Sequence, residues 1–88
     1  MIEITKVEHV SDFRLRVHFS DGSVGERDFS SLLTRSGSMV QPLKDPAYFA
    51  RAFVELGALA WPNGYDLDPI ELHDDMARAG ELTREAAE

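Results

Sequence analysis

One run of seven residues constrains the fold more than any other feature of the chain. Residues 13–19 read FRLRVHF, in which apolar and polar side chains alternate without a break. Successive side chains of a strand point to opposite faces of a sheet, so this run predicts a strand with one apolar face and one polar face. The apolar face must be covered, and we therefore expect a sheet with a hydrophobic core on one side.

The residues after this run predict a β-hairpin. The turn-forming sequence SDGS at residues 20–23 leads into a second run that ends at residue 29. A two-residue loop would place Arg16 opposite Arg27, whereas a three-residue loop over residues 21–23 pairs opposite charges. We therefore expect the three-residue loop, which places Arg16 opposite Asp28, His18 opposite Glu26 and Leu15 opposite Phe29.

This register decides how the basic side chains of the polar face are interpreted. They are Arg14, Arg16 and His18. Carboxylates opposite them would neutralise the row, with each exposed pair contributing about 0.2–1 kcal/mol. We expect a solvated, charge-paired face, and an anion-binding stripe is the alternative.

A further strand and two helices are predicted before residue 55. IEITKV near the amino end predicts a strand, and SSLLTR predicts a short helical turn that Ser30 would cap. Asp45, followed by proline, begins another helix. We extend this helix to Val54 because its two phenylalanines lie four residues apart and would share a face, which leaves Tyr48 and Arg51 exposed.

The dipeptide Asn63-Gly64 predicts a second hairpin. Type I′ turns favour this dipeptide because both residues tolerate a positive φ. A two-residue loop would place Trp61 opposite Asp66. We expect the strand before this turn to run over residues 56–61.

A last helix is predicted from Pro69 to Gly80. Asp68 is its N-cap, and Glu71 completes a capping box. Leu72, Met76 and Ala79 would share the buried face.

Together these elements predict an α+β fold. We expect a small antiparallel sheet, built from two hairpins plus an N-terminal strand and packed with two or three short helices. Residues 1–80 would form a single domain, and residues 81–88 a short C-terminal tail. Folding of so short a chain removes roughly 60–65% of its exposed surface, so a large buried cleft is not expected.

Charge and composition narrow the functional classes. The net charge is −7, of which residues 1–60 contribute −1 and residues 61–88 contribute −6. Direct binding of nucleic acid is therefore disfavoured, whereas a basic protein partner is easier to accommodate. The chain has no cysteine, which excludes disulfides and thiolate chemistry and favours the cytoplasm. We see no secretory segment and no apolar run of the ~18 residues that a membrane span requires.

Residues 61–76 hold five carboxylates and a histidine, but structural roles account for most of them. Asp68 and Glu71 cap the last helix, and the remaining acids of its first half suit the helix dipole. Asp66 has no such role. Asp66, Asp68 and His73 could form a metal site, which makes a small metal-dependent hydrolase or ligand-binding protein an alternative. No catalytic motif is present, and we expect no enzyme activity, no cofactor and no bound metal.

Aromatic and polar side chains around the second hairpin are our candidate partner-binding surface. The residues are Trp61, Asn63, Tyr65 and Asp66, with Tyr48 and Arg51 from the preceding helix. Acids of the last helix would assist electrostatic steering of the partner.

Four motifs in order resemble the bacterial family of unknown function DUF2442. They are FSDG at residue 19, DFSSLL at residue 28, PLKDPAYF at residue 42 and WPNGYDL at residue 61, and the likeness covers roughly residues 2–73. The resemblance implies a compact α+β fold with an antiparallel sheet and no established activity. It also implies short single-domain proteins, some encoded in the manner of toxin and antitoxin pairs and some with a C-terminal helix-turn-helix. The tail after Gly80 is too short for such an appendage.

The leading hypothesis is therefore a cytoplasmic protein-interaction or regulatory module, such as the antitoxin-like half of a two-protein pair. A self-associating structural domain, in which an open sheet edge pairs with a second copy, is a further alternative.

Overall fold

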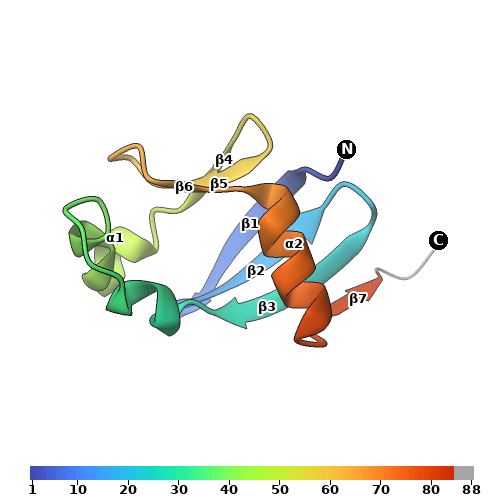
Figure 1. The fold of residues 1–88 in the computed structure, drawn as a ribbon, viewed down its shortest axis with the longest axis horizontal. Coiled ribbons are helices and arrows are strands. Elements are labelled where there is room, and N and C mark those ends of the chain that lie inside the picture. Colours follow the sequence, from blue (N-terminus) through green and yellow to red (C-terminus); the bar gives the residue numbers. More distant parts are fainter. Residues whose placement is uncertain (85–88) are drawn as a thin grey trace.

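The computed structural model describes residues 1–84 and confirms the α+β class. The strands form two antiparallel sheets, whereas we predicted one (Figure 1). The first sheet has the order β1-β2-β3-β7, and the second has the order β4-β5-β6. The strands of the first sheet are β1 (Ile4–Ser11), β2 (Arg14–Phe19), β3 (Ser23–Asp28) and β7 (Leu82–Arg84). Those of the second are β4 (Phe53–Glu55), β5 (Ala58–Ala60) and β6 (Asp66–Leu67).

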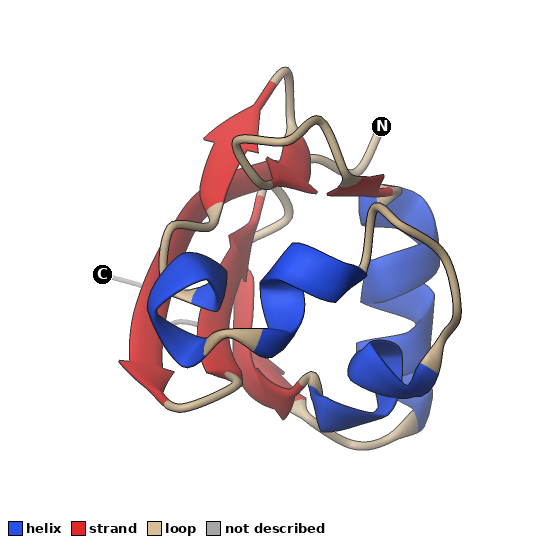
Figure 2. Cartoon of the chain, turned by 90° about the vertical axis from the view of Figure 1, so that its left-hand side faces the viewer, coloured by secondary structure: helices blue, strands red, loops and turns tan. Residues whose placement is uncertain are grey.

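Four short helices complete the described chain. Figure 2 shows that they gather on one side of the strands. They are the 3-10 helices η1 (Ser30–Thr34) and η2 (Gln41–Lys44) and the α-helices α1 (Pro46–Phe49) and α2 (Pro69–Arg78). None of these helices, which all lie within residues 1–84, has the length and apolar character that crossing a membrane requires.

The first hairpin has a three-residue loop, but the predicted register is wrong by two residues. The loop comprises residues 20–22, and Arg16 lies opposite Glu26 rather than Asp28. Gly22 adopts φ +89° inside the loop, a conformation that favours glycine. Asp21 accepts hydrogen bonds from both the backbone N and Oγ of Ser23, so β3 begins at Ser23. Because the shift is even, every side chain keeps its predicted face.

Carboxylates on both neighbouring strands neutralise the basic row, which confirms a charge-paired face. Arg16 forms an ion pair with Glu26 on β3. His18 Nε2 lies 2.9 Å from an oxygen of Glu8 on β1, a strand that our pairing scheme left out.

Residues 82–84, which we assigned to a tail, belong to the sheet. They form β7, which pairs with the first residues of β3. Gly25 permits this approach, because a Cβ at that position would lie 2.2 Å from the carbonyl oxygen of Glu81. The remaining residues of the predicted tail, 85–88, lie outside the described part of the chain.

The helix predicted for residues 46–54 is wrong beyond its first turn. Asp45 caps it as predicted by accepting a hydrogen bond from the backbone N of Ala47, but α1 ends at Phe49. The chain then forms β4 and returns through a tight turn at Leu56 and Gly57, which adopt φ values of 52° and 81°. A leucine at a positive φ is uncommon. The continuous strand that we predicted for residues 56–61 is therefore wrong at its first two residues, which form this turn.

The turn at Asn63 and Gly64 is longer than predicted by one residue. Gly64 N donates to Trp61 O and Trp61 N donates to Tyr65 O, each at 2.9 Å, so the loop spans residues 62–64. Ala60 rather than Trp61 therefore lies opposite Asp66. The side chain of Asn63 explains the extra residue, because its Oδ1 accepts a hydrogen bond from the backbone N of Tyr65.

The start of α2 agrees with its sequence pattern. The side chain of Asp68 accepts a hydrogen bond from the backbone N of Ile70, and proline occupies the first turn. Leu72 and Met76 are buried, but Ala79, which we placed on the same face, is exposed. The predicted cap at Ser30 is also wrong, since Asp28 Oδ1 instead accepts from the backbone N of Ser30.

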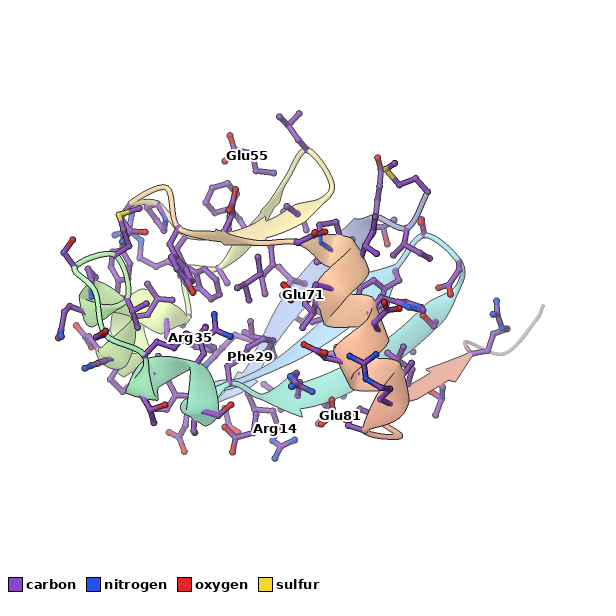
Figure 3. All side chains as sticks on the ribbon, viewed as in Figure 1. Arg14, Phe29, Arg35, Glu55, Glu71 and Glu81 are labelled. Atoms are coloured by element: carbon purple, nitrogen blue, oxygen red, sulfur yellow. The ribbon has the colours of Figure 1, made fainter. Side chains whose placement is uncertain are left out.

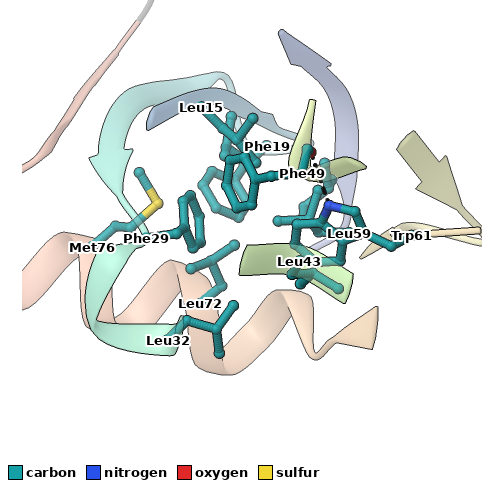
Figure 4. Close-up of a cluster of buried hydrophobic side chains, with 12 residues drawn as sticks. Leu15, Phe19, Phe29, Leu32, Leu43, Phe49, Leu59, Trp61, Leu72 and Met76 are labelled. Atoms are coloured by element: carbon teal, nitrogen blue, oxygen red, sulfur yellow. Dashed lines mark hydrogen bonds between the residues drawn. The ribbon is translucent and has the colours of Figure 1, made fainter. Parts of the chain in front are cut away.

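The core lies between the first sheet and the helices, with Phe49 at its centre (Figure 4). Its ring is fully buried and lies 5.3 Å from Phe13, 6.0 Å from Phe29 and 5.6 Å from Trp61, measured between centroids. Aromatic packing of this kind fixes how α1, β3 and β5 meet, and thereby positions the surface described next.

Candidate functional site

Trp61 does not belong to a binding surface. Its side chain is 1% exposed, and its indole Nε1 donates a 2.9 Å hydrogen bond to the backbone oxygen of Phe49. Part of the predicted partner-binding surface is thus a core anchor, because the Trp61 ring packs against Phe49 with centroids 5.6 Å apart.

The other residues of that surface are accessible to different degrees. Asp66 is exposed, while Asn63 and Tyr65 are half-buried. The Asn63 side chain also donates to the backbone oxygen of Met39, which ties the hairpin loop to residues 36–40. On the other segment, the guanidinium of Arg51 lies 5.6 Å from the ring centre of Tyr48.

The three residues of the alternative metal site do not converge. His73 Nε2 lies 3.0 Å from Asp21 Oδ2, and the His73 ring packs edge-on against Phe19 with centroids 4.9 Å apart. Asp68 is engaged as the helix cap. Within residues 1–84, no three His, Asp or Glu side chains form a group that could hold a metal ion.

We predicted only a turn position for Asp21, but its carboxylate also contacts His73 on α2. Hydrogen bonds from the Ser23 hydroxyl, followed by the Ser23 backbone N and His73, hold the pKa of Asp21 at about 2, below its usual 3.8. The carboxylate therefore joins the β2–β3 loop to α2. Nothing in the sequence pairs positions 21 and 73, because 52 residues separate them.

A groove of about 120 Å³ lies between η1 and α2, at the end of β3 (Figure 3). Its apolar residues come from the core, and its charged residues come from both sides. The lining residues are Arg27, Phe29, Ser31, Leu32, Arg35, Leu67, Asp68, Glu71, Leu72 and Asp75. We did not predict this site, because its residues come from two stretches, 27–35 and 67–75, that are far apart in the chain.

Two charged groups of the groove remain available for a ligand. Arg27 forms an ion pair with Glu81 at 2.7 Å, and Asp75 forms one with Arg78 at 2.8 Å. By contrast, the side chains of Arg35 and Glu71 are exposed and form no ion pair or hydrogen bond within residues 1–84. Arg35 follows η1 and Glu71 lies in the first turn of α2, so the two charges approach the groove from opposite sides (Figure 3).

Comparison with known proteins agrees with the resemblance seen in the sequence. Residues 4–75 match the family described as protein of unknown function (DUF2442). The chain belongs to this family. No protein with a curated description matches it.

A solved structure is also similar to this DUF2442 protein. It is the crystal structure of the "Putative DNA Binding Protein NE0471" from Nitrosomonas europaea ATCC 19718, with 28% sequence identity and a TM-score of 0.60. The match covers 92% of the present chain and 63% of that chain. The DUF2442 protein therefore spans less than two thirds of the length of NE0471.

Proposed function

We propose that this DUF2442 protein is a non-catalytic protein-interaction or regulatory module, and that the groove between η1 and α2 receives its partner. The observation that carries the proposal is the pair of charges, Arg35 and Glu71, that form no ion pair within residues 1–84 and lie beside an apolar floor that includes Phe29. A groove in which apolar residues lie beside a few convergent charges is typical of a binding site.

The partner segment should carry a basic side chain. The α2 side of the groove has three carboxylates, Asp68, Glu71 and Asp75. The whole chain has a net charge of −7, which would attract a basic partner during encounter. Arg35 provides a second, opposite contact that orients the segment in the groove.

Exposed residues of the second hairpin extend this surface in the proposal. Asp66 precedes the groove-lining Leu67 and Asp68 and adds a carboxylate beside them. Asn63 and Tyr65, together with Tyr48 and Arg51, remain proposed contacts for a larger partner. Trp61 is omitted because it is buried.

The family resemblance supports a role in a two-protein pair of the antitoxin type. We propose that the protein acts in the bacterial cytoplasm, in keeping with its lack of cysteine.

Affinity capture from native lysate tests the proposal. Parent protein, Glu71→Gln and Arg35→Gln would be compared at low and high salt, with Glu55→Gln and Lys44→Gln as matched controls. Glu55 and Lys44 are exposed and lie outside the groove (Figure 3 labels Glu55). We expect a protein that the parent and both controls retain, and that the groove variants or high salt release. Equal retention by all five proteins would contradict the groove assignment.

Direct DNA binding is the second candidate, because NE0471 carries the name "Putative DNA Binding Protein". The acidic charge argues against it, since DNA binders gain affinity by neutralising phosphates with Lys and Arg. We expect no change in the anisotropy of a labelled duplex at low salt, where electrostatic binding is strongest. A salt-dependent rise in anisotropy would favour the DNA candidate.

A further inference from the structure

The first sheet has an unpaired strand edge. β1 lies at one end of the strand order β1-β2-β3-β7. On the side away from β2, Ile4 N donates to Gly57 O at 2.8 Å. Within the described chain, residues 5–11 make no backbone hydrogen bond outside the β1–β2 ladder. Such an edge is a template for another strand.

Two irregularities limit the length of edge that can pair. The register between β1 and β2 shifts between Ile4 and Lys6, and again between His9 and Ser11. Bulges bend a strand and interrupt its ladder. The regular part of the edge is therefore residues 6–9, which suits a short, closed contact rather than an open-ended stack of sheets.

A second copy of the chain can pair with residues 6–9 in only a few registers. Two identical edges pair antiparallel about a two-fold axis perpendicular to the sheet, and residues opposite each other must point to the same face. The axis therefore passes through a residue. An axis at Lys6 would oppose Lys6 to itself, an axis at Glu8 would oppose Glu8 to itself, and an axis at His9 would run across the second bulge.

An axis at Val7 places opposite charges next to each other. Lys6 of each copy then lies opposite Glu8 of the other, and the two Val7 side chains meet on the core face. The Lys6 side chain is 62% exposed and lies 3.5 Å from Glu8 of its own chain, so it can turn to the second copy. We propose that the protein forms a symmetric homodimer through β1, with its two-fold axis at Val7.

The same register gives two apolar residues that are exposed in the monomer a place in the dimer contact. Val10 is 42% exposed and Leu56 is 97% exposed. Ile4 N already donates to Gly57 O, so the second copy cannot pair with Ile4, and its strand instead reaches the turn that carries Leu56 just beyond the paired residues, at Val10. The dimer therefore brings Val10 to the Leu56 turn of the second copy. A leucine held at a positive φ in solvent indicates a role outside the monomer fold.

The first test is the dependence of mass on concentration, measured for the full chain by light scattering and sedimentation equilibrium. We expect a monomer–dimer equilibrium, and Lys6→Glu should raise the dimer dissociation constant by about ten-fold or more, because Glu then faces Glu8 twice. Lys44→Glu makes the same charge change at an exposed residue of η2 and should leave the constant unchanged. A monomer at the highest soluble concentration, or equal effects of the two variants, would overturn the proposal.

The second test determines which residue of β1 lies on the two-fold axis. The chain has no cysteine, so Val7→Cys introduces a single thiol on the two-fold axis. We expect a short bifunctional thiol reagent to link Val7→Cys into a covalent dimer, whereas His9→Cys should stay monomeric because its two copies lie about 13 Å apart along the strands. Efficient linkage of His9→Cys but not of Val7→Cys would exclude this axis. A mixture of Lys6→Glu and Glu8→Lys, in which opposite charges meet again, should form heterodimers when both variants fold.

Discussion

At the scale of single residues, burial rather than residue type decides what Trp61 does. An exposed tryptophan beside a turn is a common partner anchor, and the sequence gives no sign that this one lies inside. The structure buries it completely and supplies its indole N–H with an acceptor on α1. Trp61 therefore joins two segments of the core, and its contribution is to stability.

This assignment predicts the effect of Trp61→Phe. The smaller ring leaves a gap, and the Phe49 carbonyl loses its donor, so the free energy of unfolding should fall by about 2–4 kcal/mol. Urea unfolding followed by circular dichroism would measure it, because the variant lacks the only tryptophan. Tyr65→Phe keeps a ring beside Trp61 and should change the free energy by less than about 1 kcal/mol. Similar losses in both variants would contradict the assignment.

Asp21 predicts a pH-dependent contribution. Since folding lowers its pKa from 3.8 to about 2, its stabilisation is complete above pH 3.8 and disappears as the pH falls to about 2. Asp21→Asn should therefore reduce the unfolding free energy by about 1–2 kcal/mol at pH 7, with a difference that shrinks between pH 3.8 and 2. Urea unfolding of both proteins across this range is the measurement. A difference independent of pH would show that the carboxylate charge is not involved.

At the scale of elements, the caps of the two α-helices were predictable, whereas the cap at Ser30 and the turns were not. Asp45 and Asp68 cap α1 and α2 as their sequences indicate, because a cap depends on a few adjacent residues. The two loops that we predicted have the wrong register, and the turn at Leu56 was missed. Turn length depends on side-chain bonds such as that of Asn63, and on strain that the surrounding fold maintains.

The strained turn at Leu56 predicts a stabilising substitution. Asparagine tolerates a positive φ better than leucine, and Asn-Gly is the preferred type I′ dipeptide. Leu56→Asn should therefore raise the unfolding free energy by about 1 kcal/mol in urea at low protein concentration. Ile70→Asn, an apolar-to-asparagine change in an exposed helical position, should not. If β1 forms the proposed dimer, Leu56→Asn should also weaken dimerisation while it stabilises the monomer.

At the scale of the whole molecule, β7 completes the first sheet by pairing with β3. The connection from α2 contributes the ion pair between Glu81 and Arg27, and it passes so close to Gly25 that no side chain fits there. The structured region therefore extends beyond the end of α2, and the groove between η1 and α2 depends on that pairing.

Truncation tests this pairing. A chain that ends after Gly80 should be less stable than one that ends after Arg84 by about 2–4 kcal/mol, because it lacks the β3–β7 ladder and the Arg27–Glu81 pair. Thermal and urea unfolding of the two truncated chains would compare them directly. Equal stabilities would restore the domain boundary at residue 80 that the sequence suggested.

By itself, the sequence determined the α+β class, the two faces of β2, the caps of α1 and α2 and the family. These features depend on alternation, on adjacent residues or on ordered motifs, which are local properties. Only the tertiary structure decided the separation into two sheets, the burial of Trp61, the Asp21–His73 pair and the groove with Arg35 and Glu71. Each of these joins segments far apart in the chain, and whether such segments meet depends on how the whole core packs.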